Sequence, residues 1–345
     1  MLKIALITPA GRGSRAGNRA TATRWAGLLR ELGCRVQLAG PGDDLHQLRL
    51  STSPPDLVIA LHAWRSHAAI RACRQSFPEC PLIVVLAGTD VYRFQHSHPE
   101  VVHDSLEHAT ALIGLHACVA DDIPARFRSR LHTVLQSAPT LPPGAPEPGR
   151  RHFHILVAGH LREEKDSLRT ALAVRDLPST SRLRVVQLGR AYSDEWADAA
   201  RKEMASNPRY QWYGDVPHWR VRQWMARARL MVISSRMEGG ANVVSEACVA
   251  GLPVIASDIP GNRGLLGSDY PGYFPVADTG ALRECLLRAE RDPAFVATLR
   301  ERVVAQAPRF RPEAEREALA RVIAACGLTP CEPACREPAV RESLP

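Results

Sequence analysis

The chain has 345 residues, enough for about two domains that each bury a core of their own. No apolar run approaches the roughly 18 residues that cross a bilayer, which excludes an integral membrane protein. The net charge of +8 is spread over both halves, which argues against a nucleic-acid-binding protein. The N-terminal apolar run is short and ends at Pro9, unlike a signal peptide, so we expect a cytoplasmic protein. Nine irregularly spaced cysteines are predicted to be reduced thiols.

The first half of the chain alternates short apolar segments with helix-like segments. A strand at 3–8 is followed by a loop rich in glycine and arginine at 9–18 and by a helix at about 19–32. Further strands are predicted at 35–39, 57–61, 82–86, 111–115 and 131–135. Short apolar strands separated by helices are typical of a parallel sheet covered on both faces. We therefore predict a Rossmann-like N-terminal domain at 1–140.

A proline-rich segment divides the chain. Five prolines among the eleven residues 139–149 exclude a helix or a central strand, and we predict a linker at 141–150. A second series of strands follows at 153–158, 183–188, 210–213, 230–233 and 254–256. The predicted fold class is α/β, with two doubly wound parallel-sheet domains, the second at 151–305. After Asp278 the chain is predicted to be helical to about Cys326, with 306–326 packing back on the first domain. The tail at 327–345 is predicted to be disordered.

The strongest motif lies between the strand at 230–233 and a helix predicted to begin near Ala241. It contains a glycine pair and two glutamates, Glu238 and Glu246, with seven residues between them. A helix start offers unpaired N–H groups and a positive dipole end, so it can hold a diphosphate, and glycines let that group approach closely. The two carboxylates can reach hydroxyls on either side of it. The candidate residues for binding a donor molecule that carries this diphosphate are Gly239, Gly240, Ala241, Asn242, Val243 and Glu246.

A second motif, Gly159-His160-Leu161-Arg162-Glu163-Glu164-Lys165-Asp166, directly follows the first strand of the second half. If a diphosphate bound here is a leaving group, it gains negative charge as the bond to it breaks, and fixed cations in this loop would stabilise the transition state. Lys165 is the first candidate cation. Either His160 or Arg162 can supply the second contact, and Gly159 is a candidate donor-binding position.

The loop after the first strand carries Gly11-x-Gly13-x-x-Ala16, a loose dinucleotide fingerprint. The second strand ends without the acidic residue that would bind a ribose, so we predict no nicotinamide or flavin site. The arginines of this loop indicate an anionic ligand, which is the acceptor if the chain is a two-domain glycosyltransferase, as the resemblance described below implies. The candidate acceptor-binding residues are Arg12, Arg15, Gly17, Asn18, Arg19 and Arg93.

His62, Asp90 and Arg93 come just after predicted strands, where parallel sheets carry functional loops. His62 and Asp90 can line a cleft and act beside the carbon at which a bond is made or broken, or they can be hydrogen-bonded core residues. Both interpretations stay open. Histidines at 96, 98, 103 and 108 lack the spacing of a ligand set, and the tail cysteines lack a fourth ligand, so we predict no metal site.

The Glu-x7-Glu pattern and the following Ala250-Gly251-Leu252-Pro253-Val254-Ile255-Ala256-Ser257 resemble the nucleotide-sugar site of retaining GT-B glycosyltransferases of the family 4 type. The loop at 159–166 is similar to that family's Gly-Arg-Leu-x-x-x-Lys-Gly motif, with His160 at the arginine position and Asp166 at the last glycine. The resemblance implies two Rossmann-like domains facing a cleft, the first for the acceptor and the second for a UDP-sugar. It also implies that Glu238 contacts the sugar, Glu246 the ribose and Lys165 the diphosphate.

Several segments resemble the selenosugar synthases of selenoneine biosynthesis. They are Gly13–Thr21, His62–Ser66, Ala87–Arg93, Gly159–Asp166, Pro260–Asn262 and Asp269–Pro275. This resemblance implies transfer of N-acetylglucosamine from a UDP-sugar to selenophosphate, which gives a 1-selenosugar without a cofactor. It also implies coupling to an enzyme that supplies selenophosphate and to a downstream selenoneine synthase. The alternatives are an ordinary O-glycosyltransferase with a hydroxyl acceptor and a non-catalytic nucleotide-sugar-binding protein.

Overall fold

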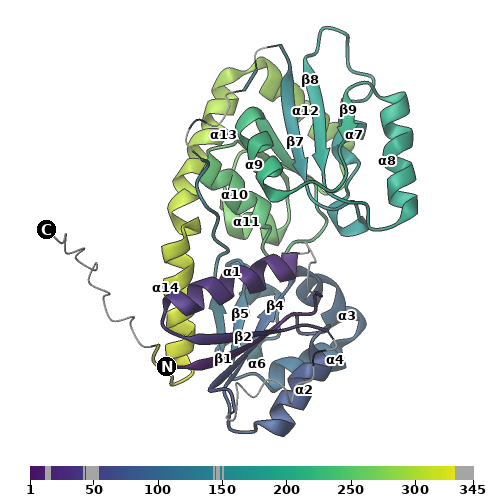
Figure 1. Ribbon diagram of the computed structural model, residues 1–345. Coiled ribbons are helices and arrows are strands. Elements are labelled where there is room, and N and C mark those ends of the chain that lie inside the picture. The colour runs from purple at the N-terminus through teal and green to yellow at the C-terminus, as the bar shows by residue number, and fades with distance from the viewer. Residues whose placement is uncertain are drawn as a thin grey trace, which may run out of the picture. The chain divides into compact units, whose positions relative to one another are not determined.

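The computed structural model describes residues 1–11, 17–41, 43, 54–142, 144, 148–149 and 151–330. The chain forms two compact units. Unit 1 consists of Met1–Gly114, Pro124–Val134 and the residues from Arg316 on, and unit 2 consists of Leu115–Ile123 and Leu135–Glu315. Each unit is built on a six-stranded parallel sheet with helices packed on it (Figure 1). The predicted α/β fold class with two doubly wound parallel sheets is confirmed.

The sheet of unit 1 has the strand order β2-β1-β3-β4-β5-β6. Every residue of the strands β3 and β4 is buried, as expected for central strands covered on both faces. The chain adds β2 on one side of β1 and then β3 on the other. The order in which strands are added therefore reverses between β1 and β3, although all strands are parallel. The strands are β1 (Lys3–Ile7), β2 (Arg35–Ala39), β3 (Leu57–Leu61), β4 (Leu82–Leu86), β5 (Ala111–Gly114) and β6 (Leu131–Thr133).

The helices of unit 1 bury one face each. The helix α1, for example, buries Trp25 and Leu29, and its last residue Glu31 pairs with Arg316 at 3.3 Å. The helical elements are α1 (Gly17–Glu31), α2 (His67–Ser76), η2 (Asp90–Phe94), α3 (Gln95–Ser97), α4 (Pro99–Glu107), α6 (Ala125–Arg128) and the part of α14 (Pro312–Ala325) from Arg316 on.

The sheet of unit 2 has the order β12-β11-β10-β7-β8-β9, again with all strands parallel. The chain adds β8 and β9 on one side of β7 and then β10 on the other. The order in which strands are added therefore reverses between β7 and β10. The strands are β7 (Phe153–Ala158), β8 (Leu183–Leu188), β9 (Tyr210–Trp212), β10 (Leu230–Ile233), β11 (Val254–Ser257) and β12 (Tyr273–Phe274).

The helices of unit 2 have clear start signals. Asp278 and Asp292 cap α12 and α13 by accepting hydrogen bonds from the first-turn amides, and Pro293 and Pro312 are first residues of helices. The helical elements are α5 (Val119–Asp122), η3 (Glu163–Lys165), α7 (Arg169–Val174), α8 (Asp194–Ser206), α9 (His218–Arg227), α10 (Asn242–Ala250), α11 (Pro260–Leu266), α12 (Thr279–Arg291), α13 (Pro293–Gln306) and η4 (Ala307–Phe310).

The structure differs from the sequence predictions mainly at element ends. The helical region after Asp278 is divided into α12, α13, η4 and α14, because aspartate caps and prolines restart the helix. The short strand β12 was not predicted, since two residues carry no periodicity. The predicted helix at 306–326 begins as the 3-10 turn η4, and α14 starts only at Pro312. Of the predicted tail, residues 331–345 lie outside the described residues.

Candidate functional site

The two motifs of the second half follow β7 and β10, the two neighbouring strands between which the strand order of unit 2 reverses. Gly159 follows β7, and Ser234 follows β10, its direct neighbour. Ligands of open α/β sheets bind at the carboxyl ends of the strands at such a switch point. The topology therefore brings the loops at 159–166 and 234–241 together.

The two loops are joined by an ion pair between the Lys165 Nζ and the Glu238 Oε1 atoms. The Glu238 side chain is 8% exposed and the Lys165 side chain 20%, so the pair is largely shielded from water. The Ser235 hydroxyl donates a second hydrogen bond to the same Glu238 oxygen at 2.5 Å. Ser234 fixes the loop at 159–166, called the lysine loop below. The Ser234 hydroxyl donates to the carbonyls of Lys165 and Asp166 at 3.2 and 3.1 Å. A cation and a carboxylate are thus fixed side by side at the switch point.

The backbone of Glu238 is fixed by close packing of α11. A Cβ atom on Gly261 would lie 2.3 Å from the Glu238 carbonyl oxygen, so only glycine fits there. The Ser257 hydroxyl donates to the Ser235 carbonyl at 2.5 Å, and the Asn262 amide donates to the Ser257 carbonyl at 2.8 Å. These contacts hold the loop in which Glu238 lies.

The helix α10 begins at Asn242, one residue after the predicted start. Its N-cap is Ala241, and no side-chain hydrogen bond caps the helix. The start of a helix favours an anionic ligand, because the positive end of the helix dipole lies there. Gly240 has a φ of +153°, and a Cβ atom there would lie 2.5 Å from the Leu115 Cβ atom. Glycine is therefore required at position 240 by close packing as well as by the turn.

Glu246 lies on α10 and is 13% exposed at its side chain. Its Oε1 atom is 3.1 Å from the Nε2 atom of His218, the first residue of α9. This contact raises the pKa of His218 above its usual range, despite the opposing effect of burial. Burial lowers the pKa of Arg222, also on α9, and Glu246 opposes that shift. Sequence reasoning missed His218, because it is 28 residues from Glu246.

The lysine loop turns at Asp166, which has a φ of +45°. This is the position at which the family motif has glycine, the residue that adopts a positive φ most readily. Aspartate tolerates the left-handed region better than most residues, and Arg169 binds both of its carboxylate oxygens, at 2.8 and 3.2 Å. Aspartate thus occupies a turn whose backbone conformation favours glycine.

We expect Asp166→Ala to lower the free energy of unfolding by about 1–2 kcal/mol more than Asp166→Gly does. Both variants lose the bonds to Arg169, but only alanine places a Cβ atom in the left-handed conformation. Urea denaturation of the two variants measures the difference. Equal stabilities would show that the turn does not need a positive φ.

The structure does not single out either His160 or Arg162 as the second cation. The Arg162 Nε atom lies 3.8 Å from Glu164, and the guanidinium lies 5.8 Å from the centre of the Tyr192 ring. That Nε atom is buried and makes no hydrogen bond within the described part of the chain. The His160 carbonyl accepts a hydrogen bond from Ser167 at 3.4 Å.

His116 is a residue that the sequence reasoning missed. It is fully buried, and burial lowers its pKa to about 4, while the nearby Glu238 carboxylate opposes the shift. A Cβ atom on Gly264 of α11 would lie 2.7 Å from its Nδ1 atom. At neutral pH a neutral imidazole therefore lies near Glu238. The signal was present, because His116 lies two residues after the strand β5, in a loop of the same kind as the one that His62 begins after β3.

The remaining predicted residues belong to unit 1. Arg12 and Arg15 lie outside the described residues, and Gly17, Asn18 and Arg19 form the start of α1. Arg93 is exposed on η2, with its guanidinium 5.6 Å from the centre of the Phe94 ring. His62 and Asp90 are both buried and contact one another at 2.7 Å. Within the described ranges no group of three or more histidine, cysteine or acidic residues could hold a metal ion.

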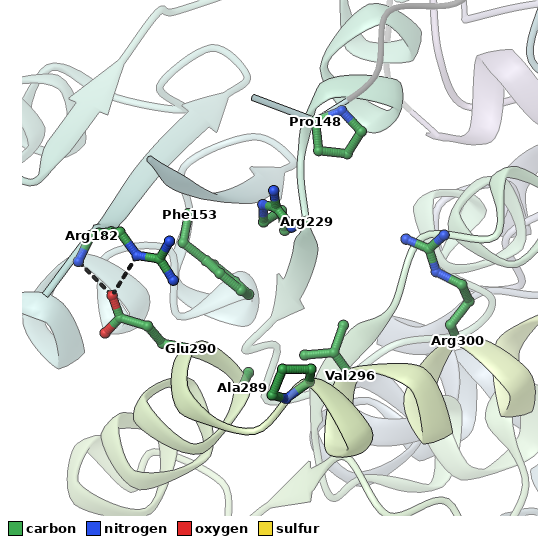
Figure 2. A pocket seen from close by; sticks show the side chains of 9 residues that line it. Pro148, Phe153, Arg182, Arg229, Ala289, Glu290, Val296 and Arg300 are labelled. Atoms are coloured by element: carbon green, nitrogen blue, oxygen red, sulfur yellow. Dashed lines mark hydrogen bonds and ion pairs between the residues drawn. The ribbon is translucent and has the colours of Figure 1, made fainter. Parts of the chain in front are cut away.

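A separate cavity of about 370 Å³ lies at the other ends of the strands of the unit 2 sheet, away from the loops at 159–166 and 234–241. Its lining includes Phe153 at the start of β7, Arg182 before β8 and Arg229 before β10, together with Glu290 and Arg300 (Figure 2). Glu290 accepts hydrogen bonds from the Arg182 amide at 2.5 Å and from Ser181 at 2.9 Å. These are the amino ends of the strands, so this cavity is not part of the switch-point site.

Residues 147–310 match the protein family described as "Glycosyl transferases group 1". A relative from Bacillus subtilis (strain 168), the putative teichuronic acid biosynthesis glycosyltransferase TuaC, is 26% identical over 278 residues, which cover 73% of this chain and 67% of the relative.

Solved structures share the fold. Alr3699/HepE of Anabaena in complex with UDP has a TM-score of 0.74 at 15% identity, covering 94% of this chain and all of that one. Sucrose-phosphate synthase from Thermosynechococcus elongatus has a TM-score of 0.74 at 18% identity, covering 94% and 98%. The lipopolysaccharide outer core galactosyltransferase WaaB has 0.67 at 17% identity, covering 94% and 99%. These likenesses identify the fold as GT-B. None of the helices in the described residues is long and apolar enough to cross a membrane.

Proposed function

We propose that this chain, which has the GT-B fold, is a group 1 glycosyltransferase. It takes a sugar from a UDP-sugar that binds at the carboxyl ends of the strands of the unit 2 sheet. The observation that carries the proposal is the shielded pair of Lys165 and Glu238 beside the uncapped start of α10. UDP as the nucleotide is supported by the Anabaena structure, which was solved with UDP and also with UDP-glucose.

Each group of the site has a role in this proposal. The start of α10, with Gly239, Gly240 and Val243, binds the diphosphate, because a helix start favours anions. Lys165 stabilises the charge that develops on the leaving UDP, and either Arg162 or His160 assists it. Glu238 accepts hydrogen bonds from sugar hydroxyls, and Glu246 accepts them from the ribose. His116, neutral at pH 7, provides a further hydrogen-bonding group close to Glu238.

Two acceptor classes remain as proposals. A hydroxyl acceptor comes first, because the relatives are described by teichuronic acid biosynthesis, by sucrose phosphate and by a lipopolysaccharide outer core. Selenophosphate as the acceptor and N-acetylglucosamine as the sugar come second. They are favoured by the segments of unit 1 that resemble the selenosugar synthases, with Arg12, Arg15, Arg19 and Arg93 as the anion-binding residues.

Calorimetric titration with UDP tests the donor site, and its pH dependence tests the role of Glu246. The ion pair of His218 and Glu246 is present below the raised pKa of His218 and is lost as the pH rises through it. Below that pKa the imidazolium competes with the ribose for Glu246. We therefore expect UDP affinity to increase between about pH 6 and pH 8 more steeply in the wild type than in His218→Gln.

The variant is a matched control, since the ionisation of UDP itself is common to both proteins. Identical pH profiles would remove Glu246 from the ribose site. An absence of UDP binding at every pH would contradict the donor proposal as a whole.

A further inference from the structure

The cavity at the amino ends of the unit 2 strands is lined by more cations than anions. Its lining contains three guanidinium groups, those of Arg182, Arg229 and Arg300, and one carboxylate, that of Glu290. These residues come from four separate segments, which are the turns before β8 and β10 and the helices α12 and α13. Figure 2 shows the Arg182 and Arg300 side chains on opposite sides of the cavity. The walls therefore carry an excess of two positive charges.

The one carboxylate of the lining has partners of its own. The Glu290 side chain is 8% exposed, and it accepts hydrogen bonds from the Ser181 hydroxyl and the Arg182 amide. The Arg182 Nε atom lies 3.9 Å from the same carboxylate. Burial and the neighbouring Arg209 guanidinium lower the pKa of Arg184 on β8, and Glu290 opposes that shift. A single negative charge is thus shared among several cations.

The other two cations of the lining have no carboxylate partner within the described part of the chain. Arg229 donates to the Gly149 carbonyl from Nε at 3.4 Å and from Nη2 at 3.2 Å, which fixes the guanidinium without neutralising it. Arg300 is exposed on α13, and no hydrogen bond or ion pair joins it to another described residue. Asp292 accepts hydrogen bonds from two first-turn amides of α13 and does not line the cavity. Arg229 and Arg300 can therefore bind an anion, because each presents a permanent charge and a planar set of donors.

The rest of the lining is apolar. Phe153, the first residue of β7, belongs to the core and reaches the cavity from the sheet. The other apolar residues are Pro148, Ala289, Pro293 and Val296. The volume of about 370 Å³ falls within the range of roughly 300–1,000 Å³ that is typical of small-molecule sites. The cavity thus fits an organic molecule that carries an anionic group on an apolar body.

We propose that this cavity binds a phosphomonoester whose organic part is compact and apolar. Such a phosphate carries a charge of about −1.5 to −2 at pH 7, which matches the excess charge of the lining, and its oxygens accept paired hydrogen bonds from guanidinium groups. The organic part covers Phe153 and Val296, and the burial of this apolar surface adds to the affinity. The site is a second ligand site of unit 2, at the strand ends opposite those that carry Lys165 and Glu238. It does not depend on sugar transfer.

Calorimetric titration with phenyl phosphate tests the site, because this probe combines a phosphate dianion with a flat apolar ring. Inorganic phosphate and benzyl alcohol present each half of the probe alone. Titrations with and without saturating UDP separate this cavity from the proposed donor site. We expect one phenyl phosphate to bind per chain, with the same affinity in both conditions, and inorganic phosphate and benzyl alcohol to bind at least about tenfold more weakly.

Two substitutions with opposite effects separate anion binding from general damage to the fold. Arg300→Gln removes a cation of the lining and is expected to weaken phenyl phosphate binding by about tenfold. Glu290→Gln keeps an acceptor oxygen for the Arg182 amide and donates to the Ser181 hydroxyl, but it removes the negative charge. It is expected to strengthen binding by about threefold, a gain that structural damage does not produce. Arg201→Gln removes an exposed cation of α8 and is the matched control, with no change expected.

Four results would overturn the site or its ligand class. Phenyl phosphate that no longer binds in the presence of UDP would belong to the donor site. An equal affinity for inorganic phosphate would exclude a role of the apolar walls. Equal weakening by Arg300→Gln and Arg201→Gln would show attraction by the net charge of the chain and not a site. No binding at millimolar phenyl phosphate would exclude the site altogether. Phenyl phosphate binding in a protein that consumes no UDP-sugar would support the site and contradict only the proposed function.

Discussion

Lys165→Ala is expected to lower turnover with a UDP-sugar on the order of 10³-fold, while the affinity for the intact UDP-sugar changes by no more than about tenfold. The diphosphate of the intact donor is already anionic, and it gains further negative charge as UDP departs, so the ammonium group interacts more strongly with the transition state than with the bound donor. It is fixed in a shielded position by Glu238, so the enzyme does not have to reorient it during the reaction. Steady-state kinetics and calorimetry of the same preparation separate the two effects.

The control addresses the carboxylate that this substitution leaves behind. Removing one partner of a shielded ion pair can destabilise a protein by several kcal/mol, because the other charge remains without compensation. The double variant Lys165→Ala/Glu238→Gln removes both charges and should recover stability without recovering turnover. A single variant with a normal turnover number would exclude Lys165 from leaving-group stabilisation.

Glu238→Gln is expected to lower kcat/KM by more than 100-fold while leaving the affinity for UDP alone nearly unchanged. Glutamine keeps the shape of the side chain, but it loses the charge-assisted hydrogen bonds, each of which contributes about 1.5–3 kcal/mol. Two such bonds are at stake, one to a sugar hydroxyl and one to Lys165. The loss should therefore appear with the sugar-bearing donor and not with the free nucleotide.

The comparison of UDP and UDP-sugar affinities by calorimetry checks this assignment. Ser206→Ala, on the exposed end of α8 and remote in sequence from both loops, is a control for general effects of substitution in unit 2. Equal losses of UDP and UDP-sugar affinity in Glu238→Gln would place Glu238 at the nucleotide instead of the sugar.

The fold was largely predictable because its signals are local. Strands such as 57–61 and 82–86 are continuous apolar runs between helical segments, and both were predicted with the bounds that the structure has. Element ends were predicted less well, since hydrogen bonding in the sheet ends β5 at Gly114 and extends β11 to Ser257. Which residues belong to which unit depends on long-range contacts. Leu115–Ile123 lies in unit 2 although the residues on both sides lie in unit 1.

The candidate site was predictable where glycine and charge occur together in one loop. Lys165, Glu238 and the glycine pair were singled out for that reason, and the adjacency of β7 and β10 explains why they meet. Contacts between distant segments could not be predicted. The His218 contact with Glu246 and the Asp90 contact with His62 depend on how helices and loops pack, and no spacing in the chain indicates them.

The most direct test of sugar transfer is mass spectrometry of purified protein incubated with UDP-glucose or UDP-N-acetylglucosamine and one acceptor at a time. Glycerol serves as the hydroxyl acceptor, freshly made selenophosphate as the anionic one, and Lys165→Ala as the control enzyme. We predict a product that carries one sugar for each UDP released, with little product from the variant. A donor that stays intact with every acceptor, water included, would contradict the assignment of UDP-sugar transfer to this site.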